Sequence, residues 1–341
     1  MKLHTTSRAV KFFLISTLLL LIAAVYLTFG TTKRAEHMVW GVSFSKRAAE
    51  GLGLDWRSIY AAILDDLRVD HVRLGSYWDE IEPQPGALDF ADLDWQIQQA
   101  EKKGVHVILT LGRRQPRWPE CHVPHWAKEL SDAEQKSALL EQVTEVVKRY
   151  RGSPAIEMWQ VENEYFLSSF GVCPTPPVRQ FLMDEIALVR SLDSRPVITT
   201  DSGEMSVWFR TAGLGDVFGT TMYRRAYNPI LGVANWPQPP VYYSRLGRVV
   251  QLFTGFKKMI IVELQGEPWA KTTLQDDTTE VNYETLSPLQ FRANIQYARD
   301  SGIDTAYLWG VEWWYYMKTE RETSGFWDEA QKLWQVSPPG I

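Results

Sequence analysis

The chain has 341 residues, of which 45% are hydrophobic and 23% are charged, and its formal net charge is −5. These values are ordinary for a globular protein and leave enough chain for one large domain with a full core. Because no basic block follows the N-terminal segment, nucleic acid is not expected as a partner. The 15 tryptophans are more unusual. They could fill the core, and a flat indole also suits stacking on a sugar ring.

An apolar segment lies close to the N-terminus. Residues 12–29 contain no charged side chain, and as a helix they would span about 27 Å, close to the ~30 Å hydrocarbon core of a bilayer. Their length and the lack of an Ala-x-Ala site favour an uncleaved signal anchor, with a cleaved signal and a secreted domain as the alternative. We expect residues 1–11 in the cytoplasm, 12–29 in the membrane, 30–37 as a linker and 38–341 as an extracytoplasmic domain.

Strand-like apolar runs then alternate with helix-like segments along the rest of the chain. The predicted strands span residues 39–44, 71–74, 105–111, 155–161, 196–200, 216–221, 258–263 and 305–310. The predicted helices span residues 55–67, 91–103, 132–150, 178–192, 240–256 and 289–301, with a closing helix within 313–334. This alternation predicts an α/β fold, a single (β/α)8 TIM barrel preceded by one transmembrane helix. An open doubly wound sheet is the alternative, but no Gly-rich phosphate loop follows the first strand.

The two cysteines, Cys121 and Cys173, both lie in Pro-rich, loop-like stretches. In an oxidising compartment a disulfide between them is plausible, and two unrelated free thiols are the alternative. Their spacing to the six histidines resembles no zinc site, so we expect neither a metal nor another cofactor.

Carboxylates stand at the ends of two of the predicted strands. The fourth strand runs into Asn163 and Glu164, and the seventh ends at Glu263. Catalytic groups of a TIM barrel lie at the C-terminal ends of its strands, and a carboxylate buried there is costly unless it is paired. Two such carboxylates are the minimum machinery for hydrolysing a glycosidic bond with retention, one as nucleophile and the other as acid and then base.

Two more strand ends carry groups that suit an ionised Glu263. A guanidinium at Arg73 would lower the pKa of this carboxyl, and the hydroxyl of Tyr223 could donate a hydrogen bond to it. Glu164 must instead hold its proton near neutrality, which burial and the negative charge of Glu263 would both favour. Asn163 is expected to bind the 2-hydroxyl of the sugar, a contact that strengthens in the transition state.

The stretch Trp159-Gln160-Val161-Glu162-Asn163-Glu164-Tyr165 resembles clan A of the retaining glycoside hydrolases, and especially its β-galactosidase branches. The resemblance covers about residues 38 to 335. It implies a TIM barrel in which the Glu of the Asn-Glu pair is the acid/base and a Glu ending the seventh strand is the nucleophile. It also maps the family's second-strand Arg, sixth-strand Tyr and eighth-strand Trp onto Arg73, Tyr223 and Trp309, with Trp309 as the floor beneath the sugar.

Other carboxylates compete for these roles. Glu162 has the same strand parity as Glu164, so we expect it to point into the barrel beneath the site. Glu267 lies in the loop after the seventh strand and is the alternative nucleophile. Asp201 and Glu204 follow the fifth strand and could contact sugar hydroxyls in outer subsites.

Several tryptophans fall in loops that are expected to follow strand ends. They are Trp78, Trp118, Trp126, Trp208, Trp236, Trp269 and Trp313. We expect two to four of them to line a cleft. Trp78 and Trp269 are the preferred substrate-binding candidates, because each closely follows a strand that carries a catalytic group.

The sequence thus predicts a membrane-anchored retaining glycoside hydrolase. Glu164 and Glu263 would cleave an O-glycosidic bond, with β the expected linkage, in an extracytoplasmic glycan by double displacement. Its expected partners are a carbohydrate substrate and, through the N-terminal helix, a membrane. Two alternatives remain open: a catalytically inert barrel that binds glycan, and a transglycosylase that uses the same residues with a sugar acceptor.

Overall fold

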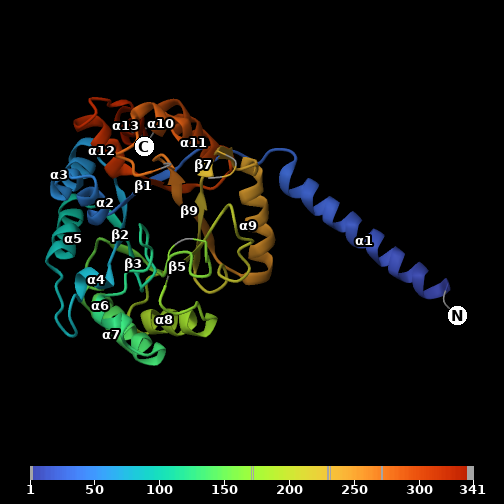
Figure 1. Ribbon diagram of the computed structural model, residues 1–341, viewed down its shortest axis with the longest axis horizontal. Coiled ribbons are helices and arrows are strands. Elements are labelled where there is room, and N and C mark those ends of the chain that lie inside the picture. The colour runs from blue at the N-terminus through green and yellow to red at the C-terminus, as the bar shows by residue number, and fades with distance from the viewer. Residues whose placement is uncertain are drawn as a thin grey trace, which may run out of the picture.

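A computed structural model describes residues 3–169, 171, 173–228, 230, 232–269 and 272–335. Eight parallel strands close into a barrel in the order β1-β10-β9-β6-β5-β4-β3-β2, which confirms the predicted TIM barrel. These strands are β1 (Val39–Phe44), β2 (His71–Gly75), β3 (His106–Leu111), β4 (Ile156–Val161), β5 (Val197–Asp201), β6 (Val217–Met222), β9 (Lys258–Gln265) and β10 (Thr305–Trp309). Figure 1 shows them at the centre of the domain with helices around them.

Long helices cover the outside of the barrel. They are α3 (Trp56–Ala62) with the π-helical turn η1 (Ile63–Leu67), α5 (Ala91–Lys103), α7 (Asp132–Tyr150), α8 (Arg179–Leu192), α9 (Pro240–Thr254), α11 (Pro288–Asp300) and α13 (Gly325–Gln335). In α7 the buried residues Leu139, Val143, Val146 and Tyr150 recur at helical spacing. The helices therefore bury one apolar stripe each against the strands.

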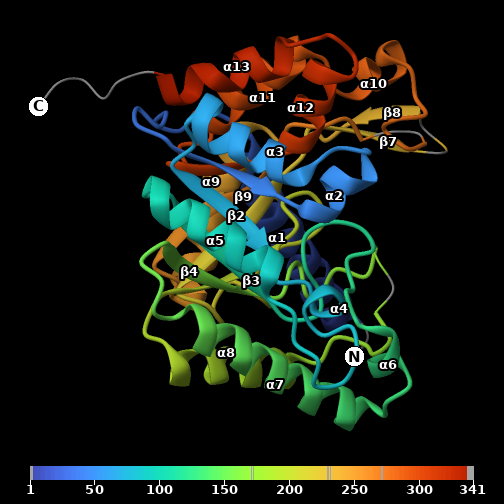
Figure 2. The same ribbon diagram turned by 90° about the vertical axis from the view of Figure 1, so that its left-hand side faces the viewer.

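Shorter elements gather at the C-terminal ends of the strands. They are α2 (Lys46–Gly51), α4 (Trp78–Ile81), α6 (His125–Lys128), α10 (Thr279–Thr285), α12 (Val311–Thr319) and the hairpin of β7 (Arg225–Asn228) with β8 (Gly232–Asn235). Figure 2 shows α2, α4, α6 and this hairpin on the same side of the barrel. They build the rim on which an active site of this fold is expected.

The structure differs from the predicted elements in a few places. The seventh barrel strand, β9, runs on to Gln265, so Glu263 lies within the strand rather than at its last position. The helix predicted over 55–67 changes to a π-helical turn after Ala62. The closing segment within 313–334 holds two helices, α12 and α13.

One side of the barrel lacks a helix. The connection between β5 and β6, residues 202–216, is described throughout and contains only turns and bends. The ring of helices therefore has a gap between α8 and α9, which are the helices on either side of this connection.

The N-terminal helix α1 (Leu3–Thr28) projects away from the domain beside α9 (Figure 1). Its stretch Val10–Thr28 has a mean hydropathy of 2.4, is not buried in the protein and is the one described helix long and apolar enough to cross a membrane. Arg245 of α9 donates hydrogen bonds to the backbone carbonyls of Tyr26 and Phe29, the latter at 2.6 Å.

The predicted disulfide between Cys121 and Cys173 is present. It joins the loop after β3 to the loop after β4, with a Cα–Cα distance of 5.3 Å. Two segments of the rim are therefore held together covalently.

Candidate active site

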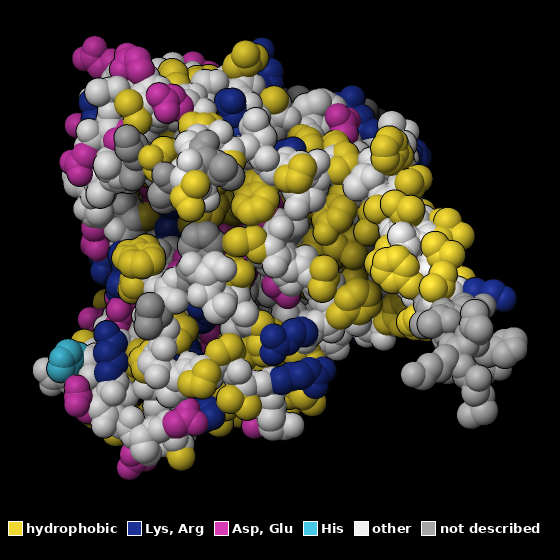
Figure 3. Space-filling view, turned by 45° about the vertical axis from the view of Figure 1, so that its right-hand side comes forward, with side chains coloured by type: hydrophobic (Ala, Val, Ile, Leu, Met, Phe, Trp, Pro, Cys, Tyr) yellow, Lys and Arg dark blue, Asp and Glu magenta, His cyan; other side chains and the backbone are white. Residues whose placement is uncertain are grey.

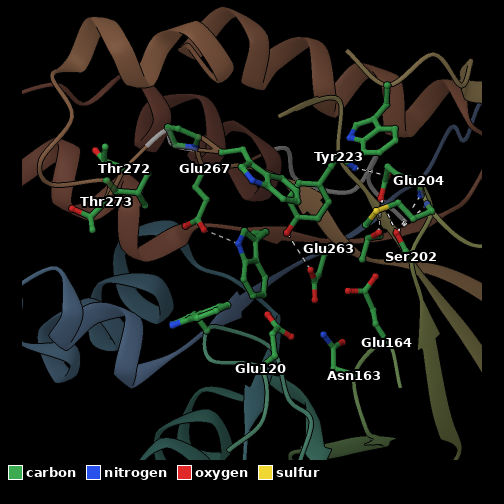
Figure 4. A pocket seen from close by; sticks show the side chains of 18 residues that line it. Glu120, Asn163, Glu164, Ser202, Glu204, Tyr223, Glu263, Glu267, Thr272 and Thr273 are labelled. Atoms are coloured by element: carbon green, nitrogen blue, oxygen red, sulfur yellow. Dashed lines mark hydrogen bonds between the residues drawn. The ribbon is translucent and has the colours of Figure 1, made fainter. Parts of the chain in front are cut away.

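A cavity of about 530 Å³ opens at the C-terminal ends of the strands. This volume lies in the range of small-molecule sites. Five carboxylates line it: Glu120, Glu164, Glu204, Glu263 and Glu267. Figure 4 shows the carboxyl groups of Glu164 and Glu263 pointing toward one another. The cavity thus brings together the two carboxylates that the strand ends predict.

Both oxygens of Glu263 have hydrogen-bond partners, and these are the two residues that the sequence predicts, Arg73 and Tyr223. Nη1 of Arg73 lies 2.9 Å from Oε1, and the hydroxyl of Tyr223 donates to Oε2 at 3.1 Å. Glu263 is 5% exposed. The two contacts give both oxygens of this buried carboxyl a hydrogen-bond partner and fix its orientation.

Arg73 also holds Asn163. Its Nη2 donates to Oδ1 of Asn163 at 2.7 Å, and its Nε donates to Oε1 of Gln160 at 2.8 Å. The same Asn163 oxygen accepts from Gln160 and from the hydroxyl of Thr200, each at 3.2 Å. Because three donors hold the amide oxygen, the NH2 group of Asn163 is the part of the side chain left for the cavity.

Glu164 lies at a strained turn just beyond β4. Its backbone has φ of 44°, an uncommon value outside glycine. Its N–H donates to Oγ1 of Thr200 at 2.9 Å, which stabilises the turn. Burial raises the pKa of the Glu164 carboxyl well above its usual range, and the negative charges of Glu263 and Glu120 raise it further. The site therefore holds one carboxyl that keeps its proton opposite one that is paired with a cation.

Glu162 is buried to one side of this site, between the segment after β3 and α8. Its carboxylate accepts from the backbone N–H groups of Arg113 at 3.1 Å and Arg114 at 2.7 Å. A Cβ at Gly112 would lie 2.7 Å from that carboxylate, and Gly112 has φ of 99°, so glycine is required there. Glu162 is fully buried and does not line the cavity. The expectation that it points into the barrel is wrong, because its backbone has φ of 59° and its carboxyl lies against Glu185 of α8, in the outer layer of helices.

Trp309 lies in a network at one wall of the cavity. Its indole N–H donates to Glu267 at 2.7 Å, and the guanidinium of Arg117 lies 4.0 Å from the centroid of its ring. Arg117 in turn donates to Glu267 and Glu312, each at 2.6 Å. Glu267 is thus engaged in holding the wall, which disfavours it as the nucleophile.

Three of the seven loop tryptophans line the cavity, namely Trp118, Trp236 and Trp269. Trp269 also packs edge-on against Tyr223, with ring centroids 5.2 Å apart. The prediction that Trp78 contacts the sugar is wrong. Its side chain is fully buried, where it packs against Trp126 and donates to Glu82 at 2.8 Å.

The remaining loop tryptophans and acids are held by packing or by hydrogen bonds to the protein. Trp208 and Trp313 are buried outside the cavity. Asp201 does not line it either, and its carboxylate accepts from Thr211 at 2.8 Å. Glu204 does line it, but both of its oxygens accept from neighbouring groups, the closest being Thr221 Oγ1 and Tyr223 N, each at 2.7 Å.

The carboxylate of Glu120 was not anticipated from the sequence. It lies in the loop after β3, next to Cys121, and has φ of 69°. Burial and the charge of Glu263 raise its pKa to about 7, while a hydrogen bond from Asn163 acts in the opposite direction. Figure 4 shows Glu120 directed into the cavity toward Asn163 and Glu263. The only available signal was its position beside a cysteine.

Among the described residues, no group of three or more His, Cys, Asp or Glu side chains is arranged to hold a metal ion.

Part of the chain is similar in sequence to known β-galactosidases. Residues 55–136 match the model of a β-galactosidase family, glycoside hydrolase family 42. The chain is 27% identical over 132 residues to the β-galactosidase Bga of Halorubrum lacusprofundi, a match that covers 33% of this chain and 18% of that protein.

Solved structures share the fold. A β-galactosidase from Marinomonas ef1 is 16% identical with a TM-score of 0.51, over 80% of this chain and 54% of that one. Xylanase 10B from Thermotoga petrophila is 15% identical with a TM-score of 0.54, over 83% of this chain and 86% of that one. The chain therefore spans about half the length of the first of these and a fifth of the curated relative. In its eight-stranded barrel and in the part of the chain that the family model matches, the protein is similar to the TIM-barrel glycoside hydrolases of clan A.

Proposed function

We propose that this protein is a retaining β-glycosidase, with Glu263 as nucleophile and Glu164 as acid/base. One observation carries the proposal: a carboxylate held by Arg73 and Tyr223 faces a second carboxyl whose pKa is raised by burial and by the first. Opposite environments for two facing carboxyls are what double displacement requires.

In the first step, Glu164 gives its proton to the leaving glycosidic oxygen while an oxygen of Glu263 attacks the anomeric carbon. The C–O bond to the leaving group breaks, and an ester between the sugar and Glu263 forms. Esterification removes the negative charge of Glu263, so the pKa of Glu164 falls. Glu164 is then ionised and can take a proton from water.

In the second step, this water attacks the anomeric carbon and the ester bond to Glu263 breaks. The carboxylate of Glu263 is restored beside Arg73, and Glu164 regains its proton. In this proposal the NH2 group of Asn163, which also bonds Glu120, binds the 2-hydroxyl of the sugar, and the walls formed by Trp309 and Trp269 supply apolar surface for the ring.

The membrane location is part of the proposal. The apolar helix α1 supports an anchor, and the disulfide between Cys121 and Cys173 supports an oxidising, extracytoplasmic compartment. We propose that α1 holds the domain at the outer surface of the membrane.

The first experiment is a panel of β-linked aryl glycosides offered to the full-length protein in detergent. The variants Glu164→Gln and Glu263→Gln run beside the wild type. Hydrolysis by the wild type alone supports both roles. Hydrolysis at the wild-type rate in both variants would contradict the assignment of Glu164 and Glu263 as the catalytic pair. A 2-deoxy-2-fluoro glycoside of the active sugar should accumulate on Glu263, and mass spectrometry of the peptide carrying that residue locates the ester.

A further inference from the structure

Large apolar side chains are exposed on one side of the domain. Val207 and Phe209 are 63% and 44% exposed, and Leu252 and Phe253 are 84% and 77% exposed. The rings of Phe209 and Phe253 lie 6.0 Å apart, which joins the two segments into one surface. We refer to these four side chains as the apolar face.

The apolar face coincides with the gap in the ring of helices. Val207 and Phe209 belong to the connection between β5 and β6, which contains no helix among residues 202–216. Phe253 and Leu252 belong to the last turn of α9, the helix that borders the gap. Contiguous exposed apolar surface on a soluble domain marks a contact with a partner or a membrane.

The same stripe of α9 that bears Leu252 also contacts the N-terminal helix. Arg245, which binds the carbonyls of Tyr26 and Phe29, precedes Leu252 by seven residues, so the two side chains point in the same direction about 10 Å apart along the axis. Figure 3 shows apolar side chains gathered on the surface of the domain beside α1. The face is therefore continuous with the place where α1 meets the domain.

The surroundings of the face suit a lipid surface. Arg210 adjoins Phe209, and Arg248 lies one turn before Leu252 on α9; both are exposed. Cations beside an apolar patch favour contact with anionic head groups. The segment that carries Val207 also reaches the cavity, because Glu204 and Met205 line it and Met205 is itself exposed.

We propose that the apolar face rests on the bilayer that α1 spans, and that the cavity, which the same β5–β6 connection borders at Glu204 and Met205, acts on a glycan attached to a lipid. The proposal about the substrate rests on the proposed glycosidase activity and on the anchor. Two attachments, α1 and the apolar face, would fix the orientation of the barrel on the membrane. The rim at residues 204–209 would then lie near the head groups, within reach of a sugar that is held there.

The contact is tested on the full-length protein in vesicles of phosphatidylcholine with phosphatidylglycerol. A nitroxide is attached to a cysteine at Val207→Cys, at Leu252→Cys or at the control Leu289→Cys. Leu289 is 72% exposed but lies in the first turn of α11, outside the apolar face and outside the stripe of α9 that carries Leu252. Labels at 207 and 252 should be reached by oxygen and shielded from a water-soluble nickel chelate, and the label at 289 should show the reverse. Equal exposure to nickel at all three sites would overturn the contact.

The substrate class is tested with two glycosides of the same sugar, one with a lipid tail in the vesicles and one that is a water-soluble aryl glycoside. The variant Leu252→Asp/Phe253→Asp should hydrolyse the vesicle-held glycoside at least about fivefold more slowly and the soluble one at the wild-type rate. Equal rates on the vesicle-held glycoside would overturn the substrate class. A wild type that is inactive on both would overturn the proposed function instead, while the labels would still decide the membrane contact.

Discussion

Nη1 of Arg73 lies 2.9 Å from Oε1 of Glu263, and both side chains are almost completely buried. The same guanidinium holds Asn163, so one cation from β2 fixes both a carboxylate from β9 and the amide beyond β4. A buried charge that serves several partners stabilises little by itself, but it sets their geometry. Arg73 is therefore best understood as a positioning residue whose loss would disturb the nucleophile and the amide together.

Replacing Arg73 with Lys tests this arrangement. Lysine keeps the positive charge but cannot present the planar fork that reaches Glu263, Asn163 and Gln160 at once. We expect kcat/KM to fall on the order of 10²-fold, because misplaced catalytic groups have effects of this size. The matched control is Arg57→Lys, which changes an exposed arginine paired with Asp92 and should leave kcat/KM unchanged. Steady-state kinetics measure kcat/KM of both variants, and a thermal melt shows whether each variant is folded. Wild-type kcat/KM in Arg73→Lys would contradict the positioning role.

The acid/base role of Glu164 predicts a dependence on the leaving group. In Glu164→Gln, kcat/KM for a glycoside with a poor leaving group should fall by about 10²–10⁴-fold, because no proton is supplied. For a dinitrophenyl glycoside, whose leaving group needs no proton, kcat/KM should stay within about tenfold of wild type. Its kcat should still fall, since the water of the second step lacks a base. Equal losses of kcat/KM on both substrates would argue against this role.

The pH profile follows from the raised pKa of Glu164. The residue must be protonated in the free enzyme, so kcat/KM should fall as the pH rises through its pKa. That pKa is raised by burial and by the charges of Glu263 and then Glu120. In Glu120→Gln one of these charges is absent, so the pKa of Glu164 falls and the basic limb of the profile should move to lower pH. A basic limb at the wild-type position would show that Glu120 does not act on Glu164.

The sequence predicted the centre of the site better than its rim. Glu164, Glu263, Arg73 and Tyr223 could be placed because each lies at or close to the end of a barrel strand, and the barrel closes these ends around one axis. Trp78 was misplaced because it begins the short helix α4, which turns its indole into the core. Packing of this kind depends on partners distant in sequence.

Glu120 was missed for a related reason. It lies nine residues beyond the end of β3, in a loop with no periodic pattern, and its direction depends on a left-handed backbone conformation and the disulfide at the next residue. None of these is visible in local residue patterns. The short stretch of sequence between the fifth and sixth predicted strands leaves little room for a helix between β5 and β6. The contact between Phe209 and Phe253, in contrast, could not be predicted from the sequence.

The disulfide between Cys121 and Cys173 should stabilise the fold and the rim. It closes a sequence separation of 52 residues, for which loop entropy predicts a contribution of about 4 kcal/mol. The double variant Cys121→Ser/Cys173→Ser should melt at a lower temperature and, because Glu120 adjoins the bond, should have a higher KM. Reductant should shift the wild type toward the variant and leave the variant unchanged. An unchanged melting temperature in the variant would contradict the stabilising role.

Glu120 should also make the stability of the protein depend on pH. Its pKa is near the ordinary value of 4.5 in the unfolded chain and is raised to about 7 by burial and by Glu263 in the folded one. Between these values the unfolded chain has lost this proton while the folded protein keeps it, so the free energy of unfolding falls as the pH rises and levels off above about 7. In Glu120→Gln this contribution is absent, so the decline between pH 5 and about 7 should be shallower than in the wild type. Denaturant unfolding at several pH values measures both slopes, with Glu284→Gln, which changes an exposed helix residue, as the control. Identical slopes for Glu120→Gln and the wild type would show that Glu120 ionises equally in both states and is not held protonated by its neighbours.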